Sequence, residues 1–306
     1  MINQRLLVLG WHNVEGSWCF PSPPGSGTRG IQRQFRALKR YANVVPLGWA
    51  LRELTMGRPL PRRSVAITFD DGYRDTLEIA ARMLERLELP ATVFLVPGIL
   101  SGDVNPWWER LGWAFAKGGA GQVEWEGERL PLANSRSRLG AFKLVSERLK
   151  RRDRRQRERS TDELVSLLAP RGTYRADDLF LDWDGARALC RTMAIGSHSM
   201  HHAILAEESP EVQREDLAES RRRLQEELAV EADLFAYPNG AAGDFGPATV
   251  AAAELAGYSY SVTTQGGVNR PDTPPHEIRR WVVYPERGVA GLGVIPRDLV
   301  KAGLGR

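Results

Sequence analysis

The sequence predicts an α/β protein built on a parallel sheet or barrel, because strand-like and helix-like segments alternate along it. Apolar runs occupy residues 5–10, 64–69 and 91–98, and stretches with helical periodicity lie between them at about 30–41 and 74–88. Repeated strand–helix units are typical of parallel sheets. The runs at 64–69 and 91–98 contain no charged residue, as expected of strands covered on both faces.

The second half of the chain continues this alternation. Residues 209–229 are predicted to form a long amphipathic helix with Leu217, Leu224 and Leu228 on one face. A helix is also expected to begin within 179–190, and short strands are expected at 193–197, 234–237, 259–263 and 281–284.

The pattern loosens between about 101 and 180, where we expect a mainly helical insertion within a single domain spanning 1–306. Four of the nine tryptophans lie in this stretch, at positions 107, 108, 113 and 125. Tryptophan can stack on sugar rings, but packing of a small helical unit is the interpretation we favour.

Composition excludes some classes of protein. The 42 Lys and Arg residues barely exceed the 38 Asp and Glu residues, so no nucleic-acid partner is expected. Two cysteines, Cys19 and Cys190, are too few for a disulfide framework. The apolar run near the N-terminus is too short for a signal peptide or a membrane span. We therefore expect a cytoplasmic protein.

Residues 136–159 carry eleven Lys or Arg against three Asp or Glu. A solvated helix face is the usual structure of such a run. A second hypothesis is weak contact with an acidic glycan or with an anionic membrane, at the inner face of the membrane, which would suit a lipid-linked sugar substrate.

Two adjacent carboxylates, Asp70 and Asp71, follow the apolar run at 64–69. Neighbouring ionised carboxylates repel, and burying either is costly, so a fold that retains the pair normally supplies a compensating cation. The alternative is that Asp70 caps the following helix while Asp71 lies in solvent.

Three of the five histidines lie within residues 195–205. His198 and His202 are four residues apart, so one helical turn or a tight loop can direct both imidazoles at one centre. Together with a distant Asp they would make a three-ligand site for zinc with one position left open. His201 lies three residues after His198 and would also converge, and a polar surface loop is the remaining alternative.

Together, TFDDG at 68–72 and SHSMHH at 197–202 resemble the motifs of the polysaccharide deacetylase family, the NodB-homology hydrolases. Trp183 before a helix, the run 220–240 ending in FAYPNG, and Gly257-Tyr258 before a strand extend the resemblance over most of the chain. The resemblance implies a distorted parallel (β/α) barrel.

The resemblance also implies roles for single residues. Asp71, His198 and His202 would bind the metal, for which zinc is expected, and Asp70 would act as general base toward a metal-bound water. The backbone N–H of Tyr237 would complete an oxyanion hole.

Two family positions are not filled. The Arg that pairs with the catalytic Asp in better-known members is replaced near Ala236, and Arg280 is our candidate substitute, with Arg279 as the neighbouring alternative. Residues 281–306 contain no histidine to protonate the leaving amine. His12, after the strand-like run at 5–10, is our candidate for proton donation or substrate binding.

These observations predict a metal-dependent hydrolase that removes N-acetyl groups from an amino sugar or polysaccharide. Its partner would be an acetylated amino-sugar glycan or a lipid-linked sugar. An O-deacetylase would use the same residues, and a catalytically weakened sugar-binding module is a second alternative. A Mg²⁺-dependent phosphoester hydrolase using Asp70, Asp71 and Asp75 is disfavoured by the clustered histidines.

Overall fold

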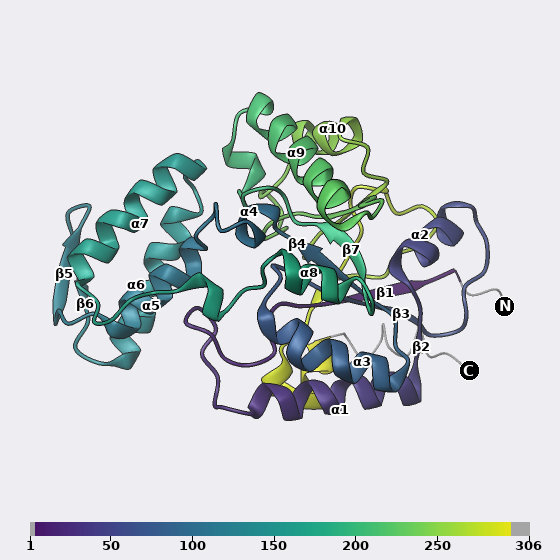
Figure 1. The fold of residues 1–306 in the computed structure, drawn as a ribbon, viewed down its shortest axis with the longest axis horizontal. Coiled ribbons are helices and arrows are strands. Elements are labelled where there is room, and N and C mark those ends of the chain that lie inside the picture. Colours follow the sequence, from purple (N-terminus) through teal and green to yellow (C-terminus); the bar gives the residue numbers. More distant parts are fainter. Residues whose placement is uncertain (1–3, 295–306) are drawn as a thin grey trace.

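The computed structural model describes residues 4–294, and its centre is one parallel sheet of eight strands (Figure 1). The strand order is β10-β1-β3-β4-β7-β8-β9, with the short β2 also paired to β3. The strands are β1 (Leu6–Trp11), β2 (Asn43–Val44), β3 (Ser64–Phe69), β4 (Ala91–Leu95), β7 (Ala194–Ser197), β8 (Leu234–Ala236), β9 (Tyr260–Val262) and β10 (Trp281–Val282).

The segment before β10 joins the two ends of the sheet. The N–H of Ile278 donates to the Ser261 carbonyl at 2.9 Å, and the N–H of Thr263 donates to the Ile278 carbonyl at 2.8 Å. A few residues later the same segment becomes β10 and pairs with β1. The sheet therefore curls into a distorted (β/α) barrel, which confirms the predicted fold class, and the 278–282 segment is its seam.

Helices cover the sheet from outside. In Figure 1, α1 and α3 lie below the sheet, while α9 and α10 lie above it. The helices of this part are α1 (Ser26–Tyr41), α2 (Leu47–Thr55), the π-helix η1 (Thr76–Ala81) continuing as α3 (Arg82–Leu87), α4 (Pro97–Leu100), α8 (Trp183–Leu189), α9 (Pro210–Leu228) and α10 (Pro247–Leu255). Short 3₁₀ segments are η2 (Ala176–Asp178), η3 (Leu205–Glu207) and η4 (Pro285–Val294).

Side-chain alternation along the strands builds two cores. Leu9 and Ile67 pack with Phe35 and Leu84 under α1 and α3. Their neighbours in sequence point the other way, so that one group of side chains fills the barrel interior and packs on α2; its members include Val8, Ala66, Phe94, Ala236, Val262 and Ile278. Apolar residues are thus needed on both faces of each strand.

The long helix expected at 209–229 is α9, and each of its ends lies within one residue of the predicted bounds. In α9, Leu217 and Leu224 are fully buried, and Leu228 packs partly against the core. The strand expected at 91–98 ends at Leu95, because Pro97 starts α4. We did not predict β2, α2 or α10; β2 has only two residues and carries no periodic signal.

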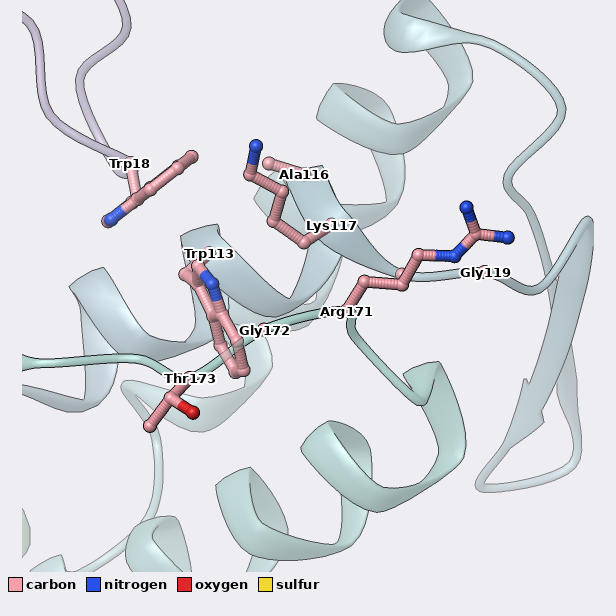
Figure 2. Close-up of a pocket in the computed structure, with 9 residues that line it drawn as sticks. Trp18, Trp113, Ala116, Lys117, Gly119, Arg171, Gly172 and Thr173 are labelled. Atoms are coloured by element: carbon pink, nitrogen blue, oxygen red, sulfur yellow. The ribbon is translucent and has the colours of Figure 1, made fainter.

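Residues 107–168 form a mainly helical unit with its own hydrophobic cluster, at the left of Figure 1. It comprises α5 (Trp107–Lys117), the hairpin β5 (Gln122–Trp125) and β6 (Glu128–Pro131), α6 (Ser135–Leu149) and α7 (Arg154–Leu168). Its four tryptophans are at most 8% exposed, so they pack this unit as expected. Trp113 also borders a cleft on its surface (Figure 2). The single-domain organisation stays a prediction.

Many cations of the basic run 136–159 contact their own unit. Arg138 donates to the carbonyls of Phe115 and Ala120, and Arg157 is 1% exposed. Arg148 pairs with Glu128, and Arg152 pairs with Glu126. The run is therefore not a uniformly solvated face. Across residues 4–294 we find no helix with the length and apolar character needed to cross a bilayer.

Candidate active site

Acidic and imidazole side chains meet at the carboxyl ends of neighbouring strands. Asp70 and Asp71 directly follow β3, and His198 directly follows β7, with only β4 between the two strands. The N–H of Asp70 donates to the Trp11 carbonyl at 2.9 Å, and the N–H of His198 donates to the Leu95 carbonyl at 2.8 Å. These bonds extend the parallel ladders by one step and carry the functional side chains to one edge of the barrel.

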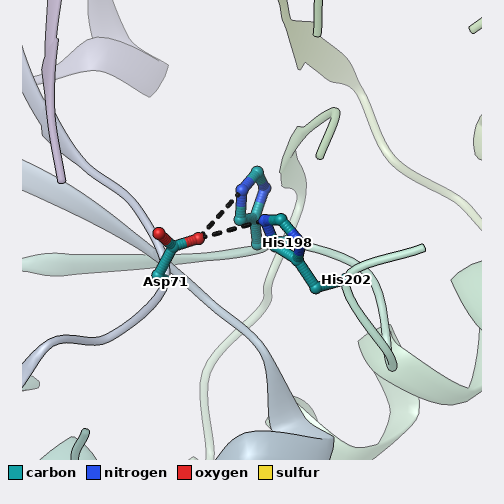
Figure 3. A group of neighbouring side chains, drawn as sticks. All are labelled: Asp71, His198 and His202. Carbon is teal, nitrogen blue, oxygen red and sulfur yellow. Dashed lines mark ion pairs between the residues drawn. The ribbon is translucent and has the colours of Figure 1, made fainter. Parts of the chain in front are cut away.

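Asp71, His198 and His202 converge on one point (Figure 3). The Nε2 atoms of His198 and His202 lie 3.4 Å and 3.2 Å from Oδ1 of Asp71. The potential ligand atoms all lie within 4.8 Å of one another. Oδ1 of Asp71 is buried and has no hydrogen-bond partner among the described residues. A cation in this position would satisfy it.

The hydrogen bond on the far side of His198 strengthens this conclusion. Its Nδ1 lies 2.7 Å from the Ala236 carbonyl, which can only accept, so Nδ1 carries a proton. In the neutral imidazole, Nε2 then presents a lone pair toward the Asp71 carboxylate. Two lone pairs that face each other in a buried site require a proton or a metal ion between them. The residues present therefore fit a divalent metal.

The backbone at the site adopts uncommon conformations. Asp71 has φ 70°, Ser199 has φ 65° and His202 has φ 51°, all in the left-handed region. Such conformations cost energy for residues other than glycine, and they cluster at sites where side-chain direction matters. Two of the three converging residues are held in this way, in a loop rather than in a helical turn.

Electrostatics keep Asp71 charged. Burial alone would raise its pKa, but the imidazoles of His198 and His202 hold the pKa of this carboxyl well below its usual range. Burial lowers the pKa of His202, while the nearby Asp70 and Asp71 raise that of His198 against the same effect. An ionised carboxylate beside two imidazoles is a suitable donor set for zinc.

Arg280 forms a bidentate pair with Asp70. Its Nη1 donates to Oδ1 and its Nη2 donates to Oδ2, both at 2.7 Å. Nη1 also donates to Thr68 Oγ1 at 3.1 Å, and Nε donates to the Thr263 carbonyl at 3.2 Å. Arg280 is fully buried, whereas the alternative Arg279 is exposed. Burial would raise the pKa of Asp70, but the guanidinium charge holds it below its ordinary value.

His12 lies beside this pair. Its Nε2 is 3.8 Å from Oδ2 of Asp70, and its side chain is 27% exposed. It borders a cavity of about 270 Å³ whose lining also includes Phe20, Lys143 and Tyr284. His12 therefore connects the buried carboxylate to a space open to solvent.

Asp75 does not join the carboxylates at the strand ends. Its Oδ2 accepts hydrogen bonds from the N–H groups of Val14 and Glu15 at 2.9 Å and 2.8 Å. This arrangement argues against the phosphoester alternative, which needed Asp75 beside Asp70 and Asp71. The residue instead fixes the loop that follows His12.

The oxyanion role expected for Tyr237 is wrong. Its backbone N–H donates to the Val262 carbonyl at 3.1 Å, as part of the ladder between β8 and β9. Its hydroxyl donates to the His276 carbonyl at 3.0 Å. Both donors are used inside the fold, because the hydrogen-bond ladder continues one residue past the end of β8. It is therefore not available to bind substrate.

His201 lies outside the converging group. Its Nδ1 is 2.7 Å from Oδ2 of Asp216 in α9, and Oδ1 of the same carboxylate accepts from the N–H of Met200. The sequence left open whether His201 or His202 converges with His198, and the structure distinguishes them. His202 faces Asp71, and His201 anchors the loop to α9.

Three residues of the site region were missed by sequence reasoning. The Trp108 ring lies 4.2 Å from the His202 ring, centroid to centroid, and its Nε1 donates to the Tyr73 hydroxyl at 3.0 Å. That hydroxyl donates to Oε1 of Glu109 at 2.8 Å. The only sequence signal was the single acidic residue in the apolar stretch WWERLGW. The insertion therefore contacts the site directly through α5.

Comparisons with known proteins agree with this geometry. The model of a family described as polysaccharide deacetylase matches residues 57–117 and 156–261, more than half of the chain. The Bacillus subtilis protein YxkH, which carries a provisional polysaccharide deacetylase name, is 20% identical over 295 residues, covering 94% of this chain and 75% of YxkH.

Solved structures share the fold. PplD, a deacetylase of Streptococcus pyogenes solved in complex with acetate, matches with a TM-score of 0.61 and 16% identity over 94% of this chain and 96% of its own. IcaB from Ammonifex degensii matches with a TM-score of 0.60 and 19% identity over 100% of this chain and 99% of its own. At these identities the likeness establishes the fold and not the substrate.

Proposed function

Since the chain belongs to the polysaccharide deacetylase family, we propose that it removes N-acetyl groups from an amino sugar or polysaccharide. The observation that carries the proposal is the buried edge where the group Asp71, His198 and His202 lies beside the Asp70–Arg280 pair. Amide hydrolysis needs a metal or oxyanion site, a base and an acid, and the side chains at this edge can supply all three.

We propose that Asp71, His198 and His202 hold a zinc ion. Two imidazoles and one carboxylate form a ligand set used by catalytic zinc, whereas Mg²⁺ and Ca²⁺ prefer oxygen ligands alone. Zinc bound there supplies Lewis acidity, which polarises an acetyl carbonyl and makes a water molecule more acidic.

The other residues divide the proton transfers between them. Asp70 accepts a proton from the attacking water, and Arg280 keeps that carboxylate ionised and fixes its orientation. His12, at 3.8 Å from Asp70 and beside the cavity, delivers a proton to the departing amine.

A different N–H takes the oxyanion role that Tyr237 cannot fill. Asn239 follows Pro238 in the loop after β8 and has φ 59°. In the described part of the chain its N–H donates no hydrogen bond, unlike that of Tyr237. This loop is near the metal group, because β8 supplies the Ala236 carbonyl that contacts His198.

The test combines metal analysis with acetate release. Purified protein is assayed on N-acetylglucosamine oligomers and on acetylated xylan. We expect His198→Ala and His202→Ala to lose both zinc and activity, and Asp70→Asn to keep zinc while losing roughly a hundredfold or more in rate. His12→Ala should retain zinc and lose activity on amide substrates.

The outcomes separate the alternatives. Acetate from xylan alone would identify an O-deacetylase, and sugar binding without acetate release would identify a weakened sugar-binding module. Undiminished acetate release by Asp70→Asn would remove the base role. Contact of 136–159 with an anionic membrane is a separate proposal, and equal binding to anionic and neutral liposomes would contradict it.

A further inference from the structure

A second hollow lies on the insertion, away from the metal group. This cleft of about 780 Å³ is lined by the end of α5, by residues following α7 and by the loop between β1 and α1 (Figure 2). Its side chains include two indoles, Trp18 and Trp113, and two cations, Lys117 and Arg171. No residue of the lining carries an acidic side chain.

Both cations lack an acidic partner among the residues that the structure describes. Lys117 and Arg171 are exposed, and neither forms an ion pair within the described part of the chain. Nζ of Lys117 lies 5.3 Å from the ring centroid of Trp18. By contrast, Arg148 and Arg152 of the same unit are paired with carboxylates. The cleft thus concentrates positive charge that no carboxylate of residues 4–294 neutralises by an ion pair.

The aromatic groups give the cleft a second property. Trp18 is 37% exposed, whereas Trp113 is 8% exposed, so only a small part of the Trp113 side chain is accessible from the cleft. Indole faces offer flat apolar surface with a polar edge, which suits the apolar face of a sugar ring. An indole beside free cations suits a sugar that carries a negative charge.

The cleft is joined to the active site through one carboxylate. Oε2 of Glu109 accepts from the N–H groups of Trp18 and Cys19 at 2.9 Å and 3.1 Å, and its Oε1 accepts from Tyr73. Trp18 lies six positions after His12, so the chain between them can span at most about 22 Å. A glycan of several residues could reach both places.

We propose that this cleft is a second saccharide subsite, which binds an anionic residue of the same glycan that is deacetylated at the metal group. The substrate class is then an acidic acetylated polysaccharide. The inference rests on the proposed function for its biological meaning, but binding at the cleft can be measured without turnover.

The test measures binding of two probes to the full chain by calorimetry at low ionic strength. Oligogalacturonate serves as the acidic probe, and an N-acetylglucosamine oligomer of equal length serves as the neutral one. The double variant Lys117→Ala/Arg171→Ala should bind oligogalacturonate roughly tenfold more weakly. Raising the salt concentration should reduce the affinity of the wild type toward that of the variant.

Matched controls use exposed residues elsewhere. Arg82→Ala/Arg86→Ala removes two exposed cations from α3 and should leave oligogalacturonate binding unchanged. Trp18→Ala should weaken binding, whereas Trp49→Ala should not, although both indoles are 37% exposed. Lys117→Glu should abolish the preference for the acidic probe.

Two results would overturn the subsite: equal affinity for both probes, or oligogalacturonate affinity unchanged in the double variant. A different result would contradict the proposed function while leaving the subsite intact. A protein that binds oligogalacturonate through the cleft but releases no acetate from any substrate retains the subsite and loses the deacetylase assignment.

Discussion

The Asp70–Arg280 pair shows how single atoms define the site. Both side chains are at most 1% exposed, so removing either would leave a buried charge without its partner. The guanidinium passes directly over β1 at Gly10, where an added Cβ would lie 2.9 Å from Cδ of Arg280. Glycine is therefore needed at this position to leave room for the arginine.

We predict that Gly10→Ala lowers the rate of acetate release by roughly tenfold to a hundredfold, because small displacements of a catalytic group are costly. Arg280 cannot move aside, since hydrogen bonds to Asp70, Thr68 and Thr263 fix its side chain in the barrel. Zinc content should stay at the wild-type level. The assay is the rate at saturating substrate together with metal analysis.

Gly48→Ala provides the control for this prediction. An added Cβ at Gly48 would meet only ordinary contacts, at 3.5 Å from Arg52 and 3.6 Å from Leu234. Its rate should equal that of the wild type. A Gly10→Ala protein with full activity would show that the position of Arg280 does not limit the reaction.

Among the elements, the loop between β1 and α1 contributes residues both to the active site and to the cleft on the insertion. It carries His12 at one end and Trp18 further along, and three carboxylates hold it. Asp75 accepts from Val14 and Glu15, Glu109 accepts from Trp18 and Cys19, and Glu15 accepts from Gly25 and Thr28 at the start of α1. The loop is thus fixed by carboxylate acceptors rather than by regular structure.

We predict that Glu109→Gln destabilises the protein by about 1–3 kcal/mol, because an amide cannot accept from the loop N–H groups and from Tyr73 without placing a donor against a donor. Urea unfolding measures this change. If Glu109 also positions the loop, kcat should fall at unchanged zinc content.

Glu163→Gln, at an exposed position of α7, is the matched control and should have no effect on either measurement. A Glu109→Gln protein that is destabilised but has normal kcat would reduce Glu109 to a purely structural role.

Asp75, which holds this loop, makes the stability of the protein depend on pH. Burial raises the pKa of this carboxyl from 3.8 to about 6, although the N–H groups of Glu15 and Val14 oppose the shift. Between these values the folded state binds more protons than the unfolded state, so this group's contribution to stability is full below about pH 4 and is lost as pH rises through about 6.

We predict that Asp75→Asn, whose amide oxygen can accept both N–H bonds, gains stability relative to the wild type as pH increases from 5 to 7. The relative gain over this range is about 1.3 kcal/mol, because the rest of the change falls below pH 5. Urea unfolding of both proteins across this range measures it. A difference that is constant with pH, or that changes in the opposite direction, would contradict the shift.

At the scale of the whole molecule, the metal group links segments that are distant in sequence. Asp71 follows β3, whereas His198 and His202 follow β7, more than 120 residues later. A ligand that binds only the folded state stabilises it, by about 4 kcal/mol when its concentration is a thousand times Kd. Zinc bound here would therefore join the segment after β3 to the segment after β7.

We predict that zinc raises the Tm of chelator-treated wild-type protein by several degrees in calorimetry, and that His198→Ala abolishes this increase. His201→Ala is the matched control: it removes the adjacent imidazole, which contacts Asp216, and should retain the increase. An equal zinc effect in His198→Ala would place the ion elsewhere.

Local patterns in the sequence were sufficient for the α/β class and for the two segments that carry the candidate metal residues, whereas the choice of Asp71, His198 and His202 came from the family resemblance. The strands are apolar on both faces because both faces are covered, and this leaves a run that can be recognised without the fold. Asp70, Asp71, His198 and His202 follow such runs, and the ends of parallel strands meet at one edge. These features depend on residues that are close in sequence.

Tertiary structure decided which neighbours of these residues act together. Arg280 is buried and Arg279 exposed because the barrel closes at the 278–282 segment, 210 residues from Asp70. The N–H of Tyr237 cannot bind substrate because it donates to the Val262 carbonyl, in the ladder that joins β8 to β9. Glu109 reaches the loop only when α5 packs on the barrel. Such contacts join residues far apart in the chain, and a local pattern cannot report which of two adjacent side chains points inward once the sheet is closed.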